Sequence, residues 1–165
     1  MSPTHARISI GRVADDQLAD VAEIARTTLR DFVVASGGDP TLFTEAFLRS
    51  TLQRSTILVA VHADQVVGYL QYQVQPATLV INGAALRPAW QRQGIGTELF
   101  RRAVDRADEA GCSGVQISVQ PANESVYQLY LRLGFEAGDN SSGWNQELSM
   151  DLEDVRRLLA ERASN

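Results

Sequence analysis

The sequence predicts an α/β fold of the layered α+β kind, with helices on both faces of one mixed, mostly antiparallel sheet. Short runs that alternate apolar and polar residues, typical of strands, are interspersed with segments whose apolar residues recur every three or four positions, typical of helices. Most of the strands follow one another closely, as antiparallel neighbours do. A long helix separates the runs 78–86 and 115–119, and a strand–helix–strand crossover makes that pair parallel.

The N-terminal third predicts one strand and two helices. Residues 6–13 alternate as a strand does, and Asp15 and Asp16 then supply capping groups for a helix that ends before Gly37-Gly38. A second helix is expected to start at Asp39-Pro40, where a capping carboxylate precedes a proline. The apolar stripe of the first helix is Leu18, Val21, Ala22, Ala25, Leu29 and Phe32. The apolar face of the second is Phe43, Ala46 and Phe47.

The middle of the chain predicts three consecutive strands. Residues 56–62 and 66–74 form a hairpin around a short turn at 63–65. Pro76 ends the second of these strands, and Pro88 ends the third, at residues 78–86, because proline lacks the N–H that a sheet ladder needs.

The remaining elements alternate between helix and strand. The crossover helix spans 95–110 and is closed by Gly111, and Gly134 closes a later helix in the same way. Apolar residues at 152, 155, 158 and 159 indicate a short tail helix, which either covers the sheet of its own chain or forms a homodimer surface. The other elements expected are strand 115–119, helix 123–133, strand 135–137 and strand 144–152.

Length and composition indicate a single domain over 1–165 and exclude several classes of protein. The 165 residues are 44% hydrophobic and 21% charged, an ordinary globular balance. The longest aliphatic run, Ile57–Val61, is far too short to span a membrane, and the first residues lack a signal-peptide core, so a cytoplasmic protein is expected. A net charge of −5 disfavours nucleic acid as a partner, and one cysteine with two histidines leaves no credible metal site.

The segment Arg87–Thr97, between a strand and the crossover helix, carries the clearest functional signal. Gly94 and Gly96 leave backbone N–H groups uncovered at a helix N-terminus, where the helix dipole also favours an anion. Arg92, and Arg87 at the strand end, are candidates for charged contacts to that anion. A P-loop is excluded because the chain has no lysine, and a Rossmann fingerprint lacks its third glycine. A tight turn is the alternative interpretation of the glycine pair alone.

Two motifs together resemble the GNAT superfamily of acyl-CoA-dependent N-acetyltransferases. The first is Gln91-x-x-Gly94-x-Gly96, preceded by Leu86-Arg87-Pro88. The second starts at Asn123 and continues through Tyr130 to Gly134-Phe135, at the spacing of that superfamily. The resemblance covers about residues 55–152 and says little about the acceptor.

The resemblance implies acetyl-CoA as cofactor, with CoA as product. In the superfamily the strand before the phosphate loop splays from its parallel neighbour, and the pantetheine arm lies in the gap, pairing with exposed backbone groups. The resemblance assigns the pantetheine contacts to Ala84, Ala85 and Leu86. It assigns the pyrophosphate contacts to Gln91, Arg92, Gln93, Gly94, Ile95, Gly96 and Thr97. Asn123 is implied to contact the pantetheine or the adenosine side of the cofactor.

Tyr130 is the catalytic residue that the resemblance implies, as the donor of a proton to the departing CoA thiolate. A phenol with an ordinary pKa near ~10 is protonated at neutral pH and can act as a general acid. Asn123 and Tyr130 are seven residues apart, so their side chains face the same direction on a helix. A core aromatic beside Leu129 and Leu133 is the alternative role of Tyr130.

No residue of the sequence is identified as the general base. Ser118 stands where N-terminal acetyltransferases of the ribosomal type carry a glutamate, which disfavours that activity. The candidate bases are Glu124, Asp31, Glu45 and, more often structural at such a position, His62. Polar groups expected around an acceptor pocket are Thr27, Thr28, Arg30, Asp31, Tyr69, Gln71 and Gln73. The net acidity of the chain favours a cationic amine.

Three functions are therefore compatible with the sequence. The first is transfer of an acetyl group from acetyl-CoA to a primary amine of a small molecule or a peptide by direct attack. The second is a noncatalytic acyl-CoA-binding regulatory module, motivated by the missing carboxylate base. The third is acetylation of protein N-termini.

Overall fold

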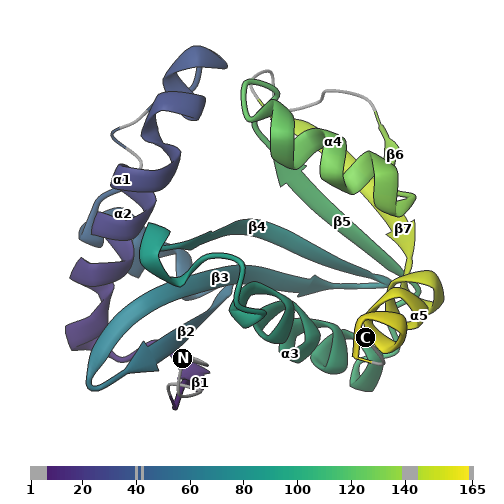
Figure 1. Cartoon of the computed structure of the whole chain (residues 1–165), viewed down its shortest axis with the longest axis horizontal. Coiled ribbons are helices and arrows are strands. Elements are labelled where there is room, and N and C mark those ends of the chain that lie inside the picture. Colours follow the sequence, from purple (N-terminus) through teal and green to yellow (C-terminus); the bar gives the residue numbers. More distant parts are fainter. Residues whose placement is uncertain (1–6, 40, 42, 139–144, 164–165) are drawn as a thin grey trace, which may run out of the picture.

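The strands of the computed structural model form one seven-stranded sheet over the residues that it describes, 7–39, 41, 43–138 and 145–163 (Figure 1). The strand order is β1-β2-β3-β4-β5-β7-β6. Neighbouring strands are antiparallel except β4 and β5, which are parallel, so the predicted mixed sheet is confirmed. The strands are β1 (Ser9–Arg12), β2 (Thr56–His62), β3 (Gln65–Gln75), β4 (Thr78–Leu86), β5 (Gly114–Val119), β6 (Glu136–Ala137) and β7 (Gln146–Asp151).

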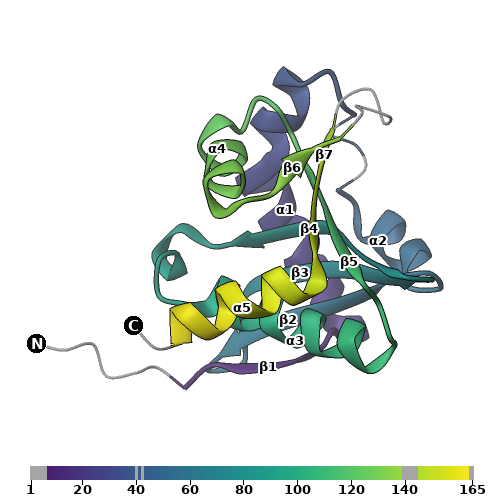
Figure 2. The ribbon, with the colours of Figure 1, turned by 90° about the vertical axis from the view of Figure 1, so that its right-hand side faces the viewer.

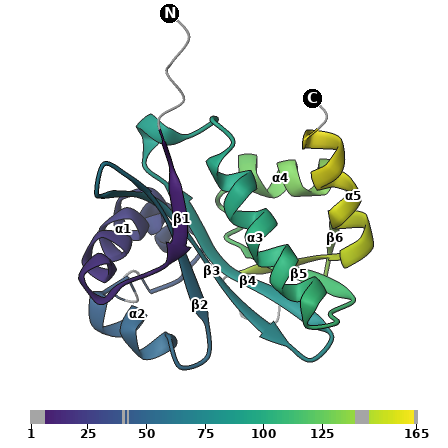
Figure 3. The same cartoon turned by 90° about the horizontal axis from the view of Figure 1, so that it is seen from below.

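Helices cover both faces of this sheet. Figure 3 shows α1 and α2 on one face and α3, α4 and α5 on the other. The helices are α1 (Leu18–Ala35), α2 (Glu45–Thr51), α3 (Ile95–Glu109), α4 (Glu124–Leu133) and α5 (Leu152–Ala163), with short 3-10 helices η1 (Asp15–Gln17) and η3 (Pro88–Trp90). Within the described ranges, none of these helices is long and apolar enough to cross a membrane.

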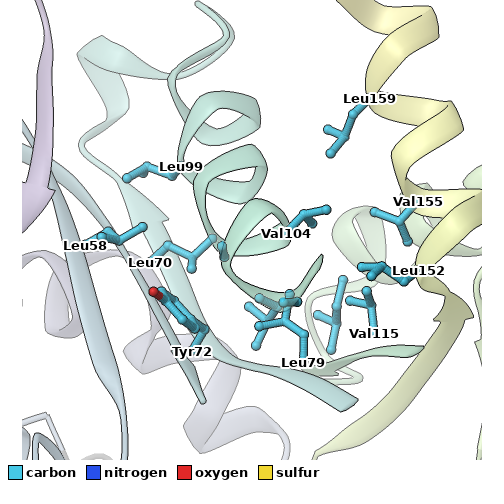
Figure 4. Packing of buried hydrophobic residues seen from close by; sticks show 14 of the residues in the cluster. Leu58, Leu70, Tyr72, Leu79, Leu99, Val104, Val115, Leu152, Val155 and Leu159 are labelled. Carbon is cyan, nitrogen blue, oxygen red and sulfur yellow. The ribbon is translucent and has the colours of Figure 1, made fainter. Parts of the chain in front are cut away.

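Each face of the sheet has its own apolar core. The α1 face buries Leu18, Val21 and Ile24 against Ile57 and Val59 of β2. The opposite face buries a larger cluster in which α3 and α5 pack on the central strands (Figure 4). Burial of apolar surface on both faces explains why the central strands are apolar along most of their length.

The tail helix α5 packs on the sheet of its own chain. Leu152, Val155 and Leu159 are buried in the same cluster as Leu99 and Val104 of α3. Figure 2 shows α5 lying beside α3, and the two helices contact each other. Of the two alternatives that its apolar stripe left open, these contacts favour the intramolecular one.

The start of α2 differs from the prediction. Asp39 does not cap it, because the Asp39 carboxylate accepts hydrogen bonds from the Thr41 backbone N–H (2.9 Å) and hydroxyl (2.6 Å). The helix begins at Glu45, and the Thr44 hydroxyl caps it by accepting from the Phe47 N–H. Leu48 is consequently the buried residue of α2, whereas Phe47 is 41% exposed. Pro40 lies outside the described residues.

Most other boundaries agree with the predictions. Gly111 and Gly134 follow α3 and α4 in the left-handed conformation, with φ of 79° and 108°. The β2–β3 turn is shorter than expected, because positive φ angles at Ala63 and Asp64 make a two-residue turn and β3 already starts at Gln65. The first strand is shorter than 6–13, and Ala6 and Trp144, the first residues of two predicted strands, lie outside the described ranges.

Candidate functional site

The parallel strands β4 and β5 separate halfway along β4. Their ladder runs from the Thr78–Gly114 pair to the Ile81–Ile117 pair. At that point the register between β3 and β4 shifts, so that Asn82 has no directly opposite residue on β3. Such a bulge bends a strand and increases its twist. Figure 1 shows β4 and β5 diverging, and the predicted splay is confirmed.

Beyond the bulge, the edge of β4 that faces β5 is open over the described residues. Ala84 and Ala85 pair on their other edge with Leu70 and Tyr69 of β3. The Leu86 carbonyl accepts a hydrogen bond from the Gln91 side chain (3.0 Å). The free part of this edge therefore lies at Ala84 and Ala85. The hydrogen bond from Gln91 holds the following loop against the end of β4.

The N-terminus of α3 is built to receive an anion. Gly94 precedes the helix in the left-handed conformation with φ of 84°. The first intrahelical hydrogen bond is donated by the Glu98 N–H to the Gly94 carbonyl (3.1 Å). The N–H groups of Ile95, Gly96 and Thr97 come before it and have no acceptor within the helix. A Cβ built on Gly96 would lie 3.7 Å from Leu86 Cδ1, its nearest neighbour, which leaves this face of the turn open. Free N–H groups and the helix dipole together favour a phosphate.

The charged and amide side chains of this loop have different roles. Gln93 donates to the Ala89 carbonyl (3.0 Å) and so stabilises the loop. Arg92 is exposed at the loop with φ of 64°. Arg87 does not face the anion site that the sequence suggested for it. Its guanidinium donates to the Val66 carbonyl (2.9 Å) and pairs with Glu23 (3.1 Å), so it joins β4 to β3 and α1.

Tyr130 lies in a cavity of about 240 Å³ that also contains Gly96 and Thr97 of α3 and Arg162 of α5. Its ring packs edge-on against Phe135, with ring centres 5.4 Å apart. Burial raises the pKa of the Tyr130 phenol, and the positive charge of Arg162 partly opposes that shift. The phenol therefore carries its proton at neutral pH and lies close to the first turn of α3.

Asn123 occupies the other end of α4. It is the residue before the helix and is 8% exposed, and its side chain makes no hydrogen bond to the residues that the structure describes. Asn123 is not among the residues that line the Tyr130 cavity. The seven-residue spacing predicted one helix face for both side chains, but Asn123 precedes the helix with non-helical backbone angles (φ −84°, ψ 67°), and the structure does not bring the two side chains into one cavity. The Asn123 amide, which is not bonded to a described residue, is available to a bound molecule.

A larger cavity, of about 400 Å³, lies on the opposite face of the sheet between α1, α2, β3 and β4. Tyr69, Gln71 and Gln73 line it, as predicted, because alternate residues of β3 point to one face. Thr27 and Thr28 do not line it. Their hydroxyls donate to carbonyls of the preceding turn of α1, including that of Ile24.

Neither cavity contains a candidate base among the described residues that line it. Arg30, Asp31 and Glu124 are exposed and line neither cavity. Glu45 pairs with Arg49 at 3.0 Å, and the His62 ring packs on Trp90 with centres 4.8 Å apart. Sequence reasoning did not predict several polar residues that line these cavities, and none of them belongs to a recognisable motif. They are Thr51, Arg54, Ser55, Asn82, Gln120 and Asn145 in the larger cavity and Arg162 in the smaller one.

We expect Tyr69 to make the protein less stable in alkali. Burial raises the pKa of its phenol well above the ordinary value of about 10. Below that pH both the folded and the unfolded state hold the proton, so the contribution to stability is complete. Above it the unfolded state loses the proton first, and the free energy of unfolding falls by up to about 1.4 kcal/mol per pH unit.

Urea denaturation at pH 8 and pH 11 measures this effect. Tyr69→Phe should lose less stability between the two pH values than the unsubstituted protein. Some loss should remain, because the pKa of Tyr130 is raised for the same reason. Equal losses in the two proteins would show that the Tyr69 phenol ionises freely in the folded state.

The family model and the similar sequences agree on one family of proteins. The sequence model of the Acetyltransferase (GNAT) family matches residues 18–135. The uncharacterized N-acetyltransferase YvbK of Bacillus subtilis (strain 168) is 25% identical over 138 residues, 82% of this chain and 77% of that protein. The [Ribosomal protein bS18]-alanine N-acetyltransferase of Escherichia coli (strain K12) is 30% identical over 91 residues, 55% of this chain and 56% of that enzyme.

Solved structures share the fold. The PaiA N-acetyltransferase of Thermoplasma acidophilum, solved in complex with coenzyme A, superposes with a TM-score of 0.72. The match covers 88% of this chain and 99% of that chain, at 16% sequence identity. At this identity the likeness establishes the arrangement of helices and strands.

Proposed function

Because the chain belongs to the Acetyltransferase (GNAT) family, we propose that it transfers an acetyl group from acetyl-CoA to a primary amine of a small molecule or a peptide. The observation that carries this proposal is the gap between β4 and β5. It is bordered by the open edge of β4, and the loop that follows β4 leads to the first turn of α3. A molecule with an extended amide-bearing arm and a pyrophosphate fits such a combination.

The residues present fit the parts of acetyl-CoA. The N–H groups of Ile95, Gly96 and Thr97 would hold the pyrophosphate, with Arg92 beside them. The backbone of Ala84 and Ala85 would pair with the pantetheine arm as an additional strand does. Asn123, buried and without a side-chain partner among the described residues, is a candidate for a further amide contact.

Acetyl-CoA supplies an acetyl group activated as a thioester. In the reaction the acceptor nitrogen forms a bond to the acetyl carbon, the carbon–sulfur bond breaks, and the nitrogen loses one proton. Tyr130 gives its phenolic proton to the leaving sulfur and regains one from solvent. The described lining of the cavities offers no carboxylate or imidazole, so we assign the proton of the amine to water.

Acetylation of a protein N-terminus is the second candidate function. It is favoured by the similarity to the [Ribosomal protein bS18]-alanine N-acetyltransferase. It is disfavoured by Ser118 on β5, which stands where the resemblance places a glutamate. A peptide with an N-terminal alanine, assayed beside small amines, separates the two candidates.

The proposal is tested by thermal unfolding with and without saturating acetyl-CoA. A ligand at one hundred times its Kd stabilises the folded state by about 2.7 kcal/mol. For a protein of this length that raises Tm by roughly 5 to 10 °C. Free CoA should act similarly, and adenosine should not.

Release of free thiol in the presence of amines then tests catalysis. Binding of acetyl-CoA without thiol release from any amine would favour the noncatalytic module. The absence of any shift at millimolar acetyl-CoA would contradict the assignment of the α3 N-terminus as a pyrophosphate site.

A further inference from the structure

The chemistry of the acceptor can be inferred from the 400 Å³ cavity between α1, α2, β3 and β4, which we call the acceptor cavity. Its volume is in the range of small-molecule sites. The cavity includes Asn82 and Gly83, the residues at which β4 leaves β5, so its occupant would lie next to the gap. The inference rests on the proposed function, because it concerns the second substrate of that reaction.

The amide of Gln71 has a fixed orientation in this cavity. Gln71 Nε2 donates to the Thr51 hydroxyl (2.8 Å) and to the Ser55 hydroxyl (2.7 Å). Each hydroxyl has one proton, and both protons are already donated to backbone carbonyls, those of Leu48 (2.6 Å) and Thr51 (2.9 Å). The hydroxyls can therefore only accept from Gln71. Gln71 Oε1, which has no partner in the described part of the chain, remains as an acceptor for an N–H group.

Tyr69 adds an unused polar group. The residue is 3% exposed, and its hydroxyl oxygen lies 3.5 Å from the position that a Cβ on Gly83 would take. That hydroxyl makes no hydrogen bond within the described ranges of the chain. The hydroxyl is therefore available for a hydrogen bond to a polar group of a ligand beside Gly83.

The charge of the cavity selects against polycations. Arg54 is its single charged residue, and no carboxylate occurs, among the described residues that line it. Arg54 is in no ion pair with another described residue. A polyamine would meet no counter-charge here, although the net charge of the whole chain is −5. A carboxylate on the acceptor would pair with the guanidinium.

The remaining wall is apolar. Phe43 and the 41% exposed Phe47 line the cavity together with Leu29 and Leu48. These side chains make one side of the cavity suitable for an apolar group of a ligand. The cavity thus combines an N–H acceptor, a cation and an apolar wall.

We propose that the acceptor is a free amino acid with an apolar side chain, whose amine donates to Gln71 Oε1 and whose carboxylate pairs with Arg54. The apolar side chain packs on Phe43 and Phe47. In the reaction the amine nitrogen gains the acetyl group and loses one proton, and CoA leaves as the free thiol.

The test compares L-phenylalanine with phenethylamine, which has the same apolar group but no carboxylate, and with spermidine. The unsubstituted protein should have the highest kcat/KM with L-phenylalanine or L-leucine. Arg54→Gln should lower kcat/KM for L-phenylalanine about tenfold more than it lowers kcat/KM for phenethylamine. A tenfold loss is at the lower end of the range expected when a hydrogen bond to a charged group is removed. Arg30→Gln is the matched control, because Arg30 is also an exposed arginine but does not line the cavity.

Calorimetric titration with L-phenylalanine in the presence of CoA separates this inference from the proposed function. Arg54-dependent binding without thiol release from any amine would support the ligand class and contradict the acetyl transfer. Thiol release with spermidine, with phenethylamine or with the alanine peptide in preference to both amino acids would overturn the inference and leave the acetyl transfer standing. An equal effect of Arg54→Gln on L-phenylalanine and phenethylamine would also overturn it.

Discussion

Gly96→Asp is expected to abolish binding of coenzyme A in a protein that remains folded. Gly96 lies in the first turn of α3, where a carboxylate interacts favourably with the helix dipole. A Cβ at this position makes an ordinary contact with Leu86, so the fold accommodates the substitution. The same carboxylate would lie among the N–H groups assigned to the pyrophosphate, and like charges would repel at short distance.

Calorimetric titration with CoA measures the effect, which should be a loss of affinity of at least about a hundredfold, or about 2.7 kcal/mol. Gly96→Ala is the control. It adds a methyl group without charge and should keep more of the affinity, while its better helix propensity should leave Tm unchanged or higher. An unaltered Kd in Gly96→Asp, with an unaltered Tm, would place the phosphates elsewhere.

Tyr130→Phe is expected to lower kcat by about a hundredfold or more with little change in the KM for acetyl-CoA. General acids contribute factors of about 10² to 10⁴, and phenylalanine removes the proton while keeping the ring that packs on Phe135. Because the pKa of Tyr130 is raised, the residue should remain protonated through the neutral range, and kcat should show no decline between pH 7 and pH 9 from this group.

Thiol release under saturating acetyl-CoA measures this effect. Tyr127→Phe is the matched control, since Tyr127 is a partly buried tyrosine one turn earlier on α4 and does not line the Tyr130 cavity. A kcat in Tyr130→Phe equal to that of Tyr127→Phe would show that solvent protonates the leaving thiolate. The role of Tyr130 would then be packing against Phe135.

Local chemistry explains why most of the fold could be predicted. Gly111 and Gly134 end helices because glycine adopts the left-handed conformation at no steric cost, and Pro88 ends β4 because it cannot donate to a ladder. The start of α2 could not be predicted, because Asp39 and Thr44 are both good capping residues. The competition is decided by the hydrogen bonds that Thr41 makes to Asp39.

The site was less accessible to sequence reasoning, because its polar groups depend on distant partners. Arg87 faces Val66 and Glu23 rather than a phosphate, and the orientation of the Gln71 amide depends on Thr51 and Ser55. No pattern in the sequence reports these pairings. The two motifs at 91–96 and 123–135 could be found in the sequence because they do not depend on distant side-chain partners. The first depends on backbone groups at a helix N-terminus, and the second on the spacing of its residues along the chain.

The short β4–β5 ladder divides the sheet into two parts, β1–β4 and β5–β7–β6, which meet over four register pairs. Elsewhere along this boundary, α3 packs on the first part, α5 packs on the second, and the two helices contact each other. A wider separation of β4 and β5 is therefore opposed by the apolar contacts that link α3 and α5. Val104 and Leu152 belong to this apolar cluster but line neither of the two cavities, so we expect substitutions there to alter ligand affinity through the spacing of the two parts rather than through contact with the ligand.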